Sequence, residues 1–204
     1  GVEAAGFTVD NNYQITATAP AGLTSGKIQV TTPAGTANST GEFLVLTGAA
    51  LRMTNQAADQ EAVSTTYNST TQEFFSVWHD NRSGNLDIYG QRSDANGNAV
   101  GGNIAISTLA DEQGNPHVSY NSTANEFLVT FSNNAPSPGS EDIYGQRVDG
   151  NGNLIGAAFI ISNAASRQLY PNSSYNPTNN EYLVIWSDGR TGGFGNLDVY
   201  GQIV

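Results

Sequence analysis

The chain has 204 residues, of which 38% are hydrophobic and 12% charged, so it can bury a core and is not typical of a disordered protein. Its formal net charge is −11, from 18 acidic residues against seven basic ones. The scarcity of Lys and Arg argues against nucleic-acid binding and against attraction to anionic lipid. No run reaches the ~18 apolar residues of a membrane span, so we also expect no membrane insertion. Cysteine is absent, which leaves stability to core packing or bound ions instead of disulfides.

Residues 1–47 predict an antiparallel β-meander. Apolar residues alternate with polar ones at Phe7 and Val9, and again at Ile28 and Val30. Alternation with a period of two is typical of half-buried strands, and Pro- and Gly-containing segments between such runs mark turns. The expected turn segments are 20–22, 25–26 and 33–35.

Three segments of this region carry a resemblance to a known family. They are Gly1-Val-Glu-Ala-Ala-Gly-Phe-Thr-Val9, Gln14-Ile-Thr-Ala-Thr-Ala-Pro20 and Gly26-Lys-Ile-Gln-Val-Thr-Thr-Pro-Ala-Gly35. Together they resemble the C-terminal two-thirds of an IPT/TIG domain, which is an immunoglobulin-like β-sandwich. The resemblance implies a partial sandwich whose first strands are missing here. Because unpaired sheet edges seldom stay unpaired, we expect either a fragment or another segment that covers the edges.

Residues 48–204 form three sequence repeats. An apolar block begins at Glu73, recurs 53 residues later at Glu126, and recurs again 55 residues later at Glu181. A Tyr-Asn pair precedes each block, and Asp-[Ile/Val]-Tyr-Gly-Gln follows it. A fixed period of this length marks a modular array of β elements. We place the repeats at about 50–103, 104–158 and 159–204.

Each repeat predicts up to four strands: the Tyr-Asn pair, the Glu-initiated block, the Asp-Ile-Tyr-Gly-Gln segment and a later apolar stretch. The second strand is apolar on both faces, because Tyr182, Val184 and Trp186 point one way. Leu183 and Ile185 point the other way. A strand buried on both sides lies between layers, and stacked four-stranded sheets are typical of a β-propeller. The predicted fold class is therefore all-β, a partial Ig-like β-sandwich plus β-propeller-like repeats of four-stranded antiparallel sheets.

The fourth strand is offset to the N-terminal side of the array. Residues 50–55 align with the fourth strand at 104–108 and 159–163, yet they precede the first repeat, and the third repeat ends after its third strand. This N-terminal segment could complete the last sheet, but closed propellers have about four to eight sheets, and three are too few. Three alternatives stay open: a fragment of a longer array, a compact threefold β fold, or sheets shared between chains.

The repeats carry the pattern Trp-x-Asp-x-Arg-x-Gly-x-x-Asp-Ile-Tyr-Gly-Gln-Arg. It runs from Trp78 to Arg92, and in the third repeat from Trp186 through Arg190 to Asp198. The middle repeat departs from it, with Ser132-Asn-Asn-Ala-Pro in place of Asp-x-Arg. The pattern resembles an array found in large secreted bacterial surface proteins. That resemblance implies an extracellular, surface-attached setting and no particular reaction.

Aspartates at both ends of a Gly-rich hairpin loop are candidate calcium ligands: Asp80 and Asp87 in the first repeat, and Asp188 and Asp198 in the third. Calcium takes six to eight oxygen ligands, which oxygen-rich loops can supply. Alternatively, each Asp caps its own turn and pairs with the arginine of its loop. The middle repeat lacks the first Asp, which favours the alternative. Calcium is the one cofactor that the sequence suggests.

An aromatic and an amide side chain share one face of the third strand in every repeat. The pairs are Tyr89 with Gln91, Tyr144 with Gln146, and Tyr200 with Gln202. An aromatic ring beside an amide suits stacking on a sugar ring with hydrogen bonds to its hydroxyls. These six are therefore candidate ligand-binding residues. The alternative is a cross-strand packing ladder repeated in every sheet.

The sequence contains no recognisable catalytic constellation. His79 and His117 occupy different positions of the repeat, and no nucleophile elbow, His-Glu-x-x-His or phosphate loop is found. A glutamate opens the second strand of every repeat, whereas a glycosidase needs two carboxylates in different environments at one centre. We therefore expect this chain not to be an enzyme.

These observations predict a non-enzymatic extracellular module, secreted or on the cell surface, for adhesion or for binding a carbohydrate or protein ligand. An acidic surface suits solubility, cations or neutral partners such as sugars. Two alternatives stay open. One is a structural subunit of an extracellular fibre or sheath, in which chains self-associate through open sheet edges. The other is an accessory segment of a polysaccharide-degrading enzyme.

Overall fold

The computed structural model confirms an all-β chain. It divides into two compact units, Gly1–Leu51 and Arg52–Val204. No helix among the described residues has the length and apolar character needed to span a membrane. The described residues are 3–4, 6–11, 14–18, 26–43, 50–134, 140–192 and 195–204.

The N-terminal unit contains two antiparallel hairpins. The strands are β1 (Gly6–Asn11) paired with β2 (Gln14–Thr18), and β3 (Gly26–Thr32) paired with β4 (Gly35–Phe43). The expected turn at 33–35 joins β3 to β4, whereas the expected turns at 20–22 and 25 lie outside the described residues. The assignment of this unit to the IPT/TIG domains stays a prediction.

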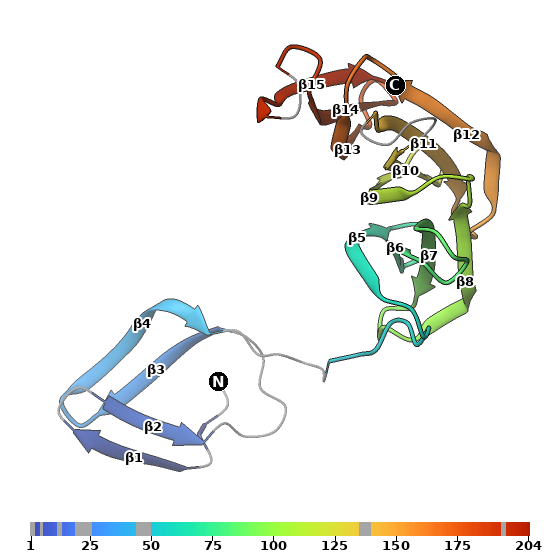
Figure 1. Cartoon of the computed structure of the whole chain (residues 1–204). Coiled ribbons are helices and arrows are strands. Elements are labelled where there is room, and N and C mark those ends of the chain that lie inside the picture. The colour runs from blue at the N-terminus through green and yellow to red at the C-terminus, as the bar shows by residue number, and fades with distance from the viewer. Residues whose placement is uncertain are drawn as a thin grey trace. The chain divides into compact units, whose positions relative to one another are not determined.

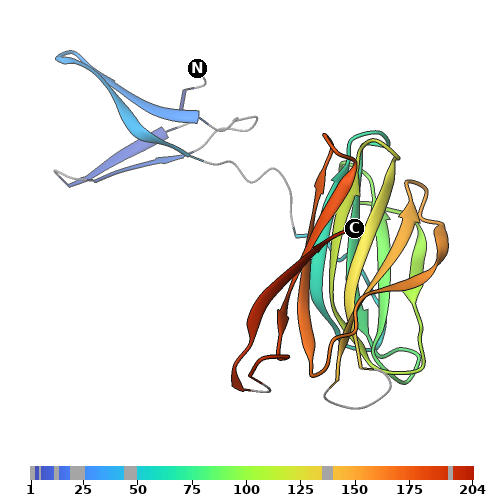
Figure 2. The ribbon, with the colours of Figure 1, turned by 90° about the horizontal axis from the view of Figure 1, so that it is seen from above.

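The C-terminal unit consists of three antiparallel sheets stacked face to face around an arc (Figures 1 and 2). Sheet 1 contains β5 (Gln60–Asn68), β6 (Glu73–Asp80), β7 (Asp87–Ser93) and β8 (Ala99–Ser107). Sheet 2 contains β9 (Gln113–Asn121), β10 (Glu126–Asn133), β11 (Asp142–Asp149) and β12 (Leu154–Ser162). Sheet 3 contains β13 (Gln168–Asn176), β14 (Glu181–Asp188) and β15 (Asp198–Ile203). The first strands, β5, β9 and β13, lie on the inner side of the arc.

Each sheet corresponds to one sequence repeat, but the sheet boundaries differ from the expected ones. The expected boundaries at 103/104 and 158/159 fall inside β8 and β12. The tight turn at 94–98 folds β8 directly back onto β7, so the fourth strand stays with its own repeat. Residues 50–55, expected as a strand, form none in the structure.

Two apolar clusters fill the spaces between the sheets. Phe75 of sheet 1 meets Phe127 of sheet 2 with ring centroids 4.6 Å apart. Leu128 of sheet 2 packs with Trp186 of sheet 3 in the second cluster. Strand β10 contributes to both clusters and is buried at every position, as its two-faced apolar sequence predicts. Each fully buried side chain of this size contributes about 1.5–3 kcal/mol.

The recurring glutamates form cross-strand ion pairs. Glu73 accepts from Arg92, with Oε2 2.8 Å from Nε, and Glu126 accepts from Arg147, with Oε2 2.6 Å from Nη2. Their repetition therefore reflects pairing of the second strand with the third. Glu181 has no such arginine, because the sequence places Ile203 there, and it accepts from neighbouring asparagine amides instead.

Glycine is required where an aromatic ring lies flat across the third strand, and substitution there tests the packing. A Cβ at Gly90 would lie 2.8 Å from Cζ of Phe75. Gly90→Ala should therefore lower the free energy of unfolding by about 1–3 kcal/mol, measured by urea denaturation. Gly102→Ala is the matched control, since its Cβ would meet nothing within 4 Å. Equal stability of the two variants would contradict this packing.

Candidate functional site

The first strand of every sheet is bulged at the same position of the repeat. The pairing register shifts there in β5, β9 and β13. One non-glycine residue at each bulge has a left-handed backbone: Ala62 (φ 51°), Asn115 (φ 52°) and Tyr170 (φ 56°). Such conformations cost about 1–3 kcal/mol each, and bulges re-aim the side chains beside them. The same strain at three equivalent positions points to a functional surface on the inner side of the arc.

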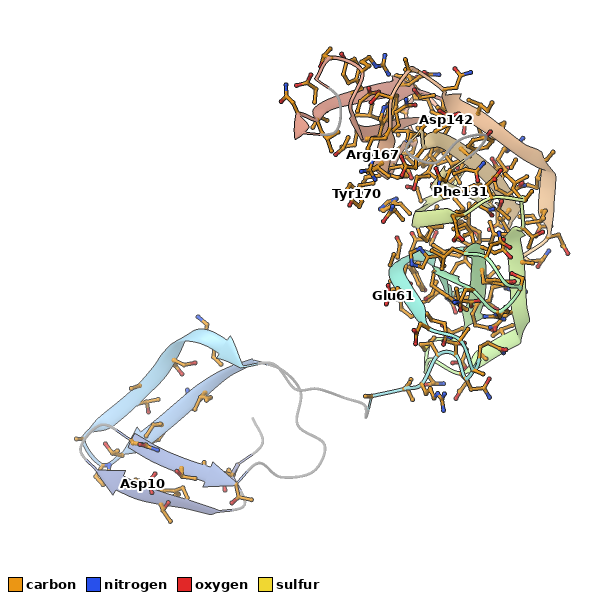
Figure 3. All side chains as sticks on the ribbon, viewed as in Figure 1. Asp10, Glu61, Phe131, Asp142, Arg167 and Tyr170 are labelled. Carbon is orange, nitrogen blue, oxygen red and sulfur yellow. The ribbon has the colours of Figure 1, made fainter. Side chains whose placement is uncertain are left out.

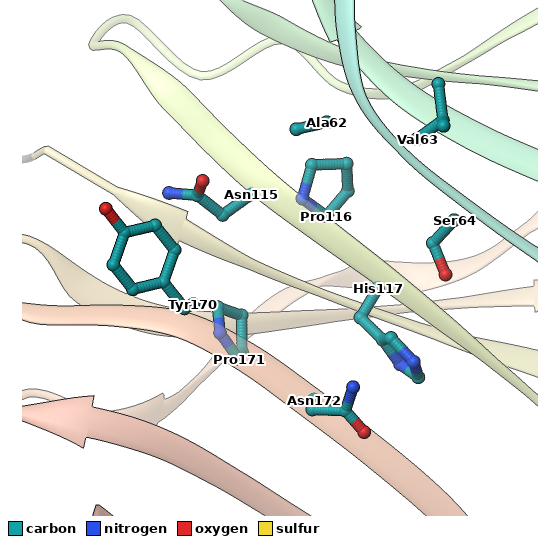
Figure 4. Close-up of a pocket in the computed structure, with 9 residues that line it drawn as sticks. All are labelled: Ala62, Val63, Ser64, Asn115, Pro116, His117, Tyr170, Pro171 and Asn172. Atoms are coloured by element: carbon teal, nitrogen blue, oxygen red, sulfur yellow. The ribbon is translucent and has the colours of Figure 1, made fainter.

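The three bulges line an open groove, which we call the bulge groove (Figure 4). Its volume of about 320 Å³ is within the range of small-molecule sites. Tyr170 is seen on the inner side of the arc (Figure 3). The lining residues are Ala62, Val63, Ser64, Asn115, Pro116, His117, Tyr170, Pro171 and Asn172.

Tyr170 provides the exposed aromatic surface of the bulge groove. Its side chain is 60% exposed, while Pro116 and Pro171 beside it are buried. Proline has no N–H to donate, so it suits a bulge, where the ladder of backbone hydrogen bonds is interrupted. A proline also restricts the backbone of the residue before it, which here is Asn115 or Tyr170. The surrounding sheets therefore hold Tyr170 in a conformation that the isolated segment would avoid.

His117 is neutral and forms part of the floor between sheets 2 and 3. Its Nδ1 accepts a hydrogen bond from the backbone N–H of Ser173 at 3.1 Å, which fixes the proton of the neutral ring on Nε2. Burial lowers the pKa of His117 below its ordinary value. The ring therefore carries no charge at pH 7 and keeps one N–H donor.

The polar groups of the bulge groove are uncharged. Its nine lining residues include no carboxylate, lysine or arginine. Asn115 donates its amide to Ser132 Oγ at 3.2 Å, which orients its carbonyl oxygen, and the side chain of Asn172 is exposed. An exposed ring flanked by amides can stack on and hydrogen-bond a neutral polar ligand. The same residues offer no pair of carboxylates for general acid–base hydrolysis.

The tyrosines predicted to bind ligand lie elsewhere, in the stack itself. Arg82 covers the ring of Tyr89, with Cζ 3.9 Å from the centroid, and Arg190 covers Tyr200 at 4.0 Å. Tyr144 stacks on Phe131 with centroids 5.9 Å apart. None of the three lines the bulge groove.

The glutamines predicted to bind ligand bond to the backbone. Gln91 Nε2 donates to the carbonyl oxygens of Arg92 at 2.8 Å and Val100 at 3.1 Å, and Gln146 makes the equivalent contacts. These hydrogen bonds satisfy backbone carbonyl groups at the points where the pairing of β8 with β7, and of β12 with β11, shifts register. Gln202 is exposed, because β15 has no further strand beside it among the described residues. Ligand binding by these six residues stays a prediction.

The aspartates predicted to bind calcium have hydrogen-bond donors. Asp80, fully buried, accepts from Trp78 Nε1 at 2.9 Å and from Arg82 Nε at 2.8 Å. Asp188 accepts from Trp186 and Arg190 in the same way. The other two also have partners: Asp87 accepts from Ser83 and Asn85, and Asp198 from Thr191.

The four aspartates predicted to bind calcium do not belong to a cluster of metal ligands among the described residues. In the parts of the chain that the structure describes, no group of three or more His, Cys, Asp or Glu converges. Calcium at Asp80, Asp87, Asp188 and Asp198 stays a prediction.

Sequence comparison of the repeats missed the bulge groove. Ala62, Asn115 and Tyr170 keep the spacings of 53 and 55 residues, but their side chains share no chemistry. A usable signal was the proline after Asn115 and Tyr170, because proline in a strand marks a bulge or an edge. A glutamine two residues before each left-handed residue also recurs. Gln113 and Gln168 are fully buried and donate to the carbonyls of the preceding loops.

Comparison with known proteins shows likeness in fold alone. No protein-family model and no curated protein matches this chain. It is similar to the structure of an N-acetylgalactosamine deacetylase from F. plautii in complex with blood group B trisaccharide. The TM-score is 0.54 at 11% identity, over 72% of this chain and 50% of that chain. This chain thus spans about half the length of that protein.

A second solved structure is less similar. It is an endo-1,5-alpha-L-arabinanase from Thermotoga petrophila RKU-1, with a TM-score of 0.38 at 13% identity. The match covers 70% of this chain and 38% of that chain. A TM-score this low carries no argument about this chain.

The buried ion pair of Asp80 predicts a pH dependence. Burial alone would raise the pKa of Asp80, but hydrogen bonds from Arg82 and Trp78 outweigh it, so the pKa is lowered. A lowered folded-state pKa stabilises the fold above the unfolded value of about 3.9, and this stabilisation is lost as pH falls through the folded value. Asp80→Asn should therefore lower the free energy of unfolding by about 3 kcal/mol at pH 7. The difference from the unaltered chain should shrink below about pH 4 in urea denaturation.

The matched control for this prediction is Asn133→Asp in the middle repeat. Asn133 is 1% exposed and occupies the position of Asp80, but the sequence has Ala135 in place of the arginine. A carboxylate buried there has no such partner, so this variant should be destabilised at pH 7 and recover on acidification. For Asn133→Asp the difference from the unaltered chain should vanish at a higher pH than for Asp80→Asn, because a buried carboxylate without an arginine has the higher pKa. The same midpoint for both differences would mean that the arginine pairing does not lower the pKa of Asp80.

Proposed function

We propose that this chain is a non-enzymatic extracellular module that binds neutral saccharides in the bulge groove. The observation that carries the proposal is Tyr170, an exposed aromatic ring held in a strained bulge between two asparagine amides. Sugar rings present apolar C–H faces to aromatic rings and hydroxyls to amides. The bulge groove offers both kinds of surface together.

The absence of charge in the lining narrows the ligand class. The imidazole of His117 is neutral at pH 7, and no lining residue is a lysine or arginine that would pair with an acidic sugar. The net charge of −11 would further repel anionic polysaccharides. Neutral hexoses and N-acetylhexosamines therefore suit the site better than uronic or sialic acids.

The structural comparison suggests a neutral blood-group oligosaccharide as the first ligand to test. The similar deacetylase structure contains a blood group B trisaccharide, a neutral glycan. That likeness concerns the fold, so the saccharide class is carried to this chain as part of the proposal. The resemblance of the repeats to secreted bacterial arrays supports an extracellular or cell-surface setting, where glycan binding would serve adhesion.

An accessory role beside a catalytic domain is the second candidate function. The chain matches half of a carbohydrate-active protein, and its bulge groove lacks the carboxylates for hydrolysis. In that case the chain would hold a polysaccharide while another domain acts on it. Binding by the chain alone is required in both cases.

Isothermal titration with neutral oligosaccharides tests the proposal, and Tyr170→Ala is the decisive variant. Loss of the stacking ring should weaken binding by about tenfold or more, which corresponds to about 1.4 kcal/mol. Phe7→Ala is the matched control, because Phe7 is a similarly exposed aromatic residue, 70% exposed, in the other unit. Unchanged affinity in Tyr170→Ala, or no binding across a broad neutral panel, would overturn the proposal.

A further inference from the structure

Asn115 and His117 are the polar residues that the middle strand of the arc, β9, contributes to the bulge groove. They lie two residues apart with Pro116 between them, and all three line the groove (Figure 4). Strand β9 contacts β5 of sheet 1 and β13 of sheet 3, so a sheet lies on each side of it. The surroundings of these two residues therefore do not depend on either end of the chain.

The amide of Asn115 is held in one orientation. Ser132 Oγ donates its only proton to the backbone carbonyl oxygen of Gly114 at 3.1 Å. It can therefore only accept from Asn115, whose Nδ2 lies 3.2 Å away. The other end of the amide, Oδ1, has no hydrogen-bond partner among the described residues. Asn115 thus presents a hydrogen-bond acceptor of fixed orientation to the groove.

The imidazole of His117 presents the opposite polarity. The backbone N–H of Ser173 donates to Nδ1 at 3.1 Å, so the neutral ring carries its proton on Nε2. A backbone N–H cannot become an acceptor, which fixes this tautomer for as long as the ring is neutral. In the part of the chain that the structure describes, Nε2 has no partner, and His117 is half-buried in the groove lining. His117 thus presents a hydrogen-bond donor.

A hydroxyl group and a secondary amide respond differently to a donor and an acceptor with fixed roles. A hydroxyl rotates and can take either role, so it does not require both partners. A secondary amide is planar and trans, so its carbonyl oxygen and its N–H point in opposite directions. Residues two apart along a strand are separated by about 6.6 Å. That separation leaves room for one amide group between Asn115 and His117.

Apolar lining residues complete a site for an acetamido group. Pro116 lies between the acceptor and the donor, and Ala62 and Val63 of β5 line the same groove. Both residues of β5 are exposed, so a ligand can reach them. A methyl group that packs against these side chains leaves water, which is favourable in proportion to the apolar area removed.

We infer that the bulge groove selects saccharides with a 2-acetamido group, the N-acetylhexosamines, over hexoses with a hydroxyl at that carbon. The inference rests on the proposed function. The acetamido N–H donates to Asn115 Oδ1, and the acetamido carbonyl oxygen accepts from His117 Nε2. The methyl group packs against Pro116, while Tyr170 stacks on the sugar ring.

Isothermal titration with N,N′-diacetylchitobiose and with cellobiose tests the inference, because these two disaccharides differ only in the group at carbon 2. The methyl glycosides of N-acetylgalactosamine and galactose form a second pair, with the other configuration at carbon 4. In at least one pair the unaltered chain should bind the acetamido sugar about tenfold more tightly than the hydroxyl sugar.

The outcomes separate this inference from the proposed function. Equal affinities within both pairs, or no binding of either acetamido sugar, would overturn the inference alone if other neutral saccharides bind. Failure of the whole neutral panel would overturn both. N-acetylalanine amide carries an amide but no sugar ring and should bind far more weakly. Binding as tight as that of the acetamido sugar would mean that the groove recognises a peptide, which would also overturn the inference.

Two variants assign the preference to Asn115 and His117. His117→Asn places a side-chain oxygen where Nδ1 accepts from Ser173, but it removes the Nε2 donor. Asn115→Gly removes the acceptor and tolerates the φ of 52°. Each variant should lower the ratio of the two dissociation constants toward one.

Tyr170→Ala is the comparison variant for these two. It should weaken binding of both sugars of a pair alike and leave the ratio unchanged, because stacking does not depend on the group at carbon 2. A ratio that survives both His117→Asn and Asn115→Gly would contradict the assigned contacts and overturn the inference.

Discussion

Burial of a sheet on both faces is the constraint on which the rest of the structure depends. Strand β10 has no exposed position, because Phe127 and Val129 face sheet 1 while Leu128 faces sheet 3. A sheet with two apolar faces cannot be stable alone, so each repeat requires neighbours. The stacking aligns the first strands of all three sheets on one side. A surface built from three chain segments far apart in sequence follows from that alignment.

The bulge groove depends on this stack for its strained backbone. Left-handed conformations at Asn115 and Tyr170, each before a proline, are held because the flanking strands are fixed by the packed clusters. His117 contributes from the same surface, since its bond to Ser173 joins sheet 2 to sheet 3 below the groove. The site is therefore a product of the array, and no single repeat contains it.

The repeat period, the all-β class and the two-faced second strand could be predicted from the sequence, because they depend on local alternation and on residues that recur in type. The recurring glutamates, which the sequence excluded from a catalytic carboxylate pair, form cross-strand ion pairs at Glu73 and Glu126. The bulge groove could not be predicted, because it depends on backbone geometry at Ala62, Asn115 and Tyr170, whose side chains have nothing in common. The recurring Tyr-x-Gln pattern predicted a ligand site on the third strand. In the structure Arg82 covers the ring of Tyr89, and Gln91 donates to a backbone carbonyl of β8.

A neutral saccharide bound in the bulge groove, as we propose, contacts the three bulged strands together. Amide chemical-shift mapping by two-dimensional NMR, with a neutral oligosaccharide titrated into the labelled chain, tests this contact most directly. The perturbed amides should cluster at 62–64, 115, 117, 170 and 172, in three separate segments that respond with one dissociation constant. Perturbations confined to a single repeat, or centred on the third strands around Tyr89 and Tyr144, would contradict it.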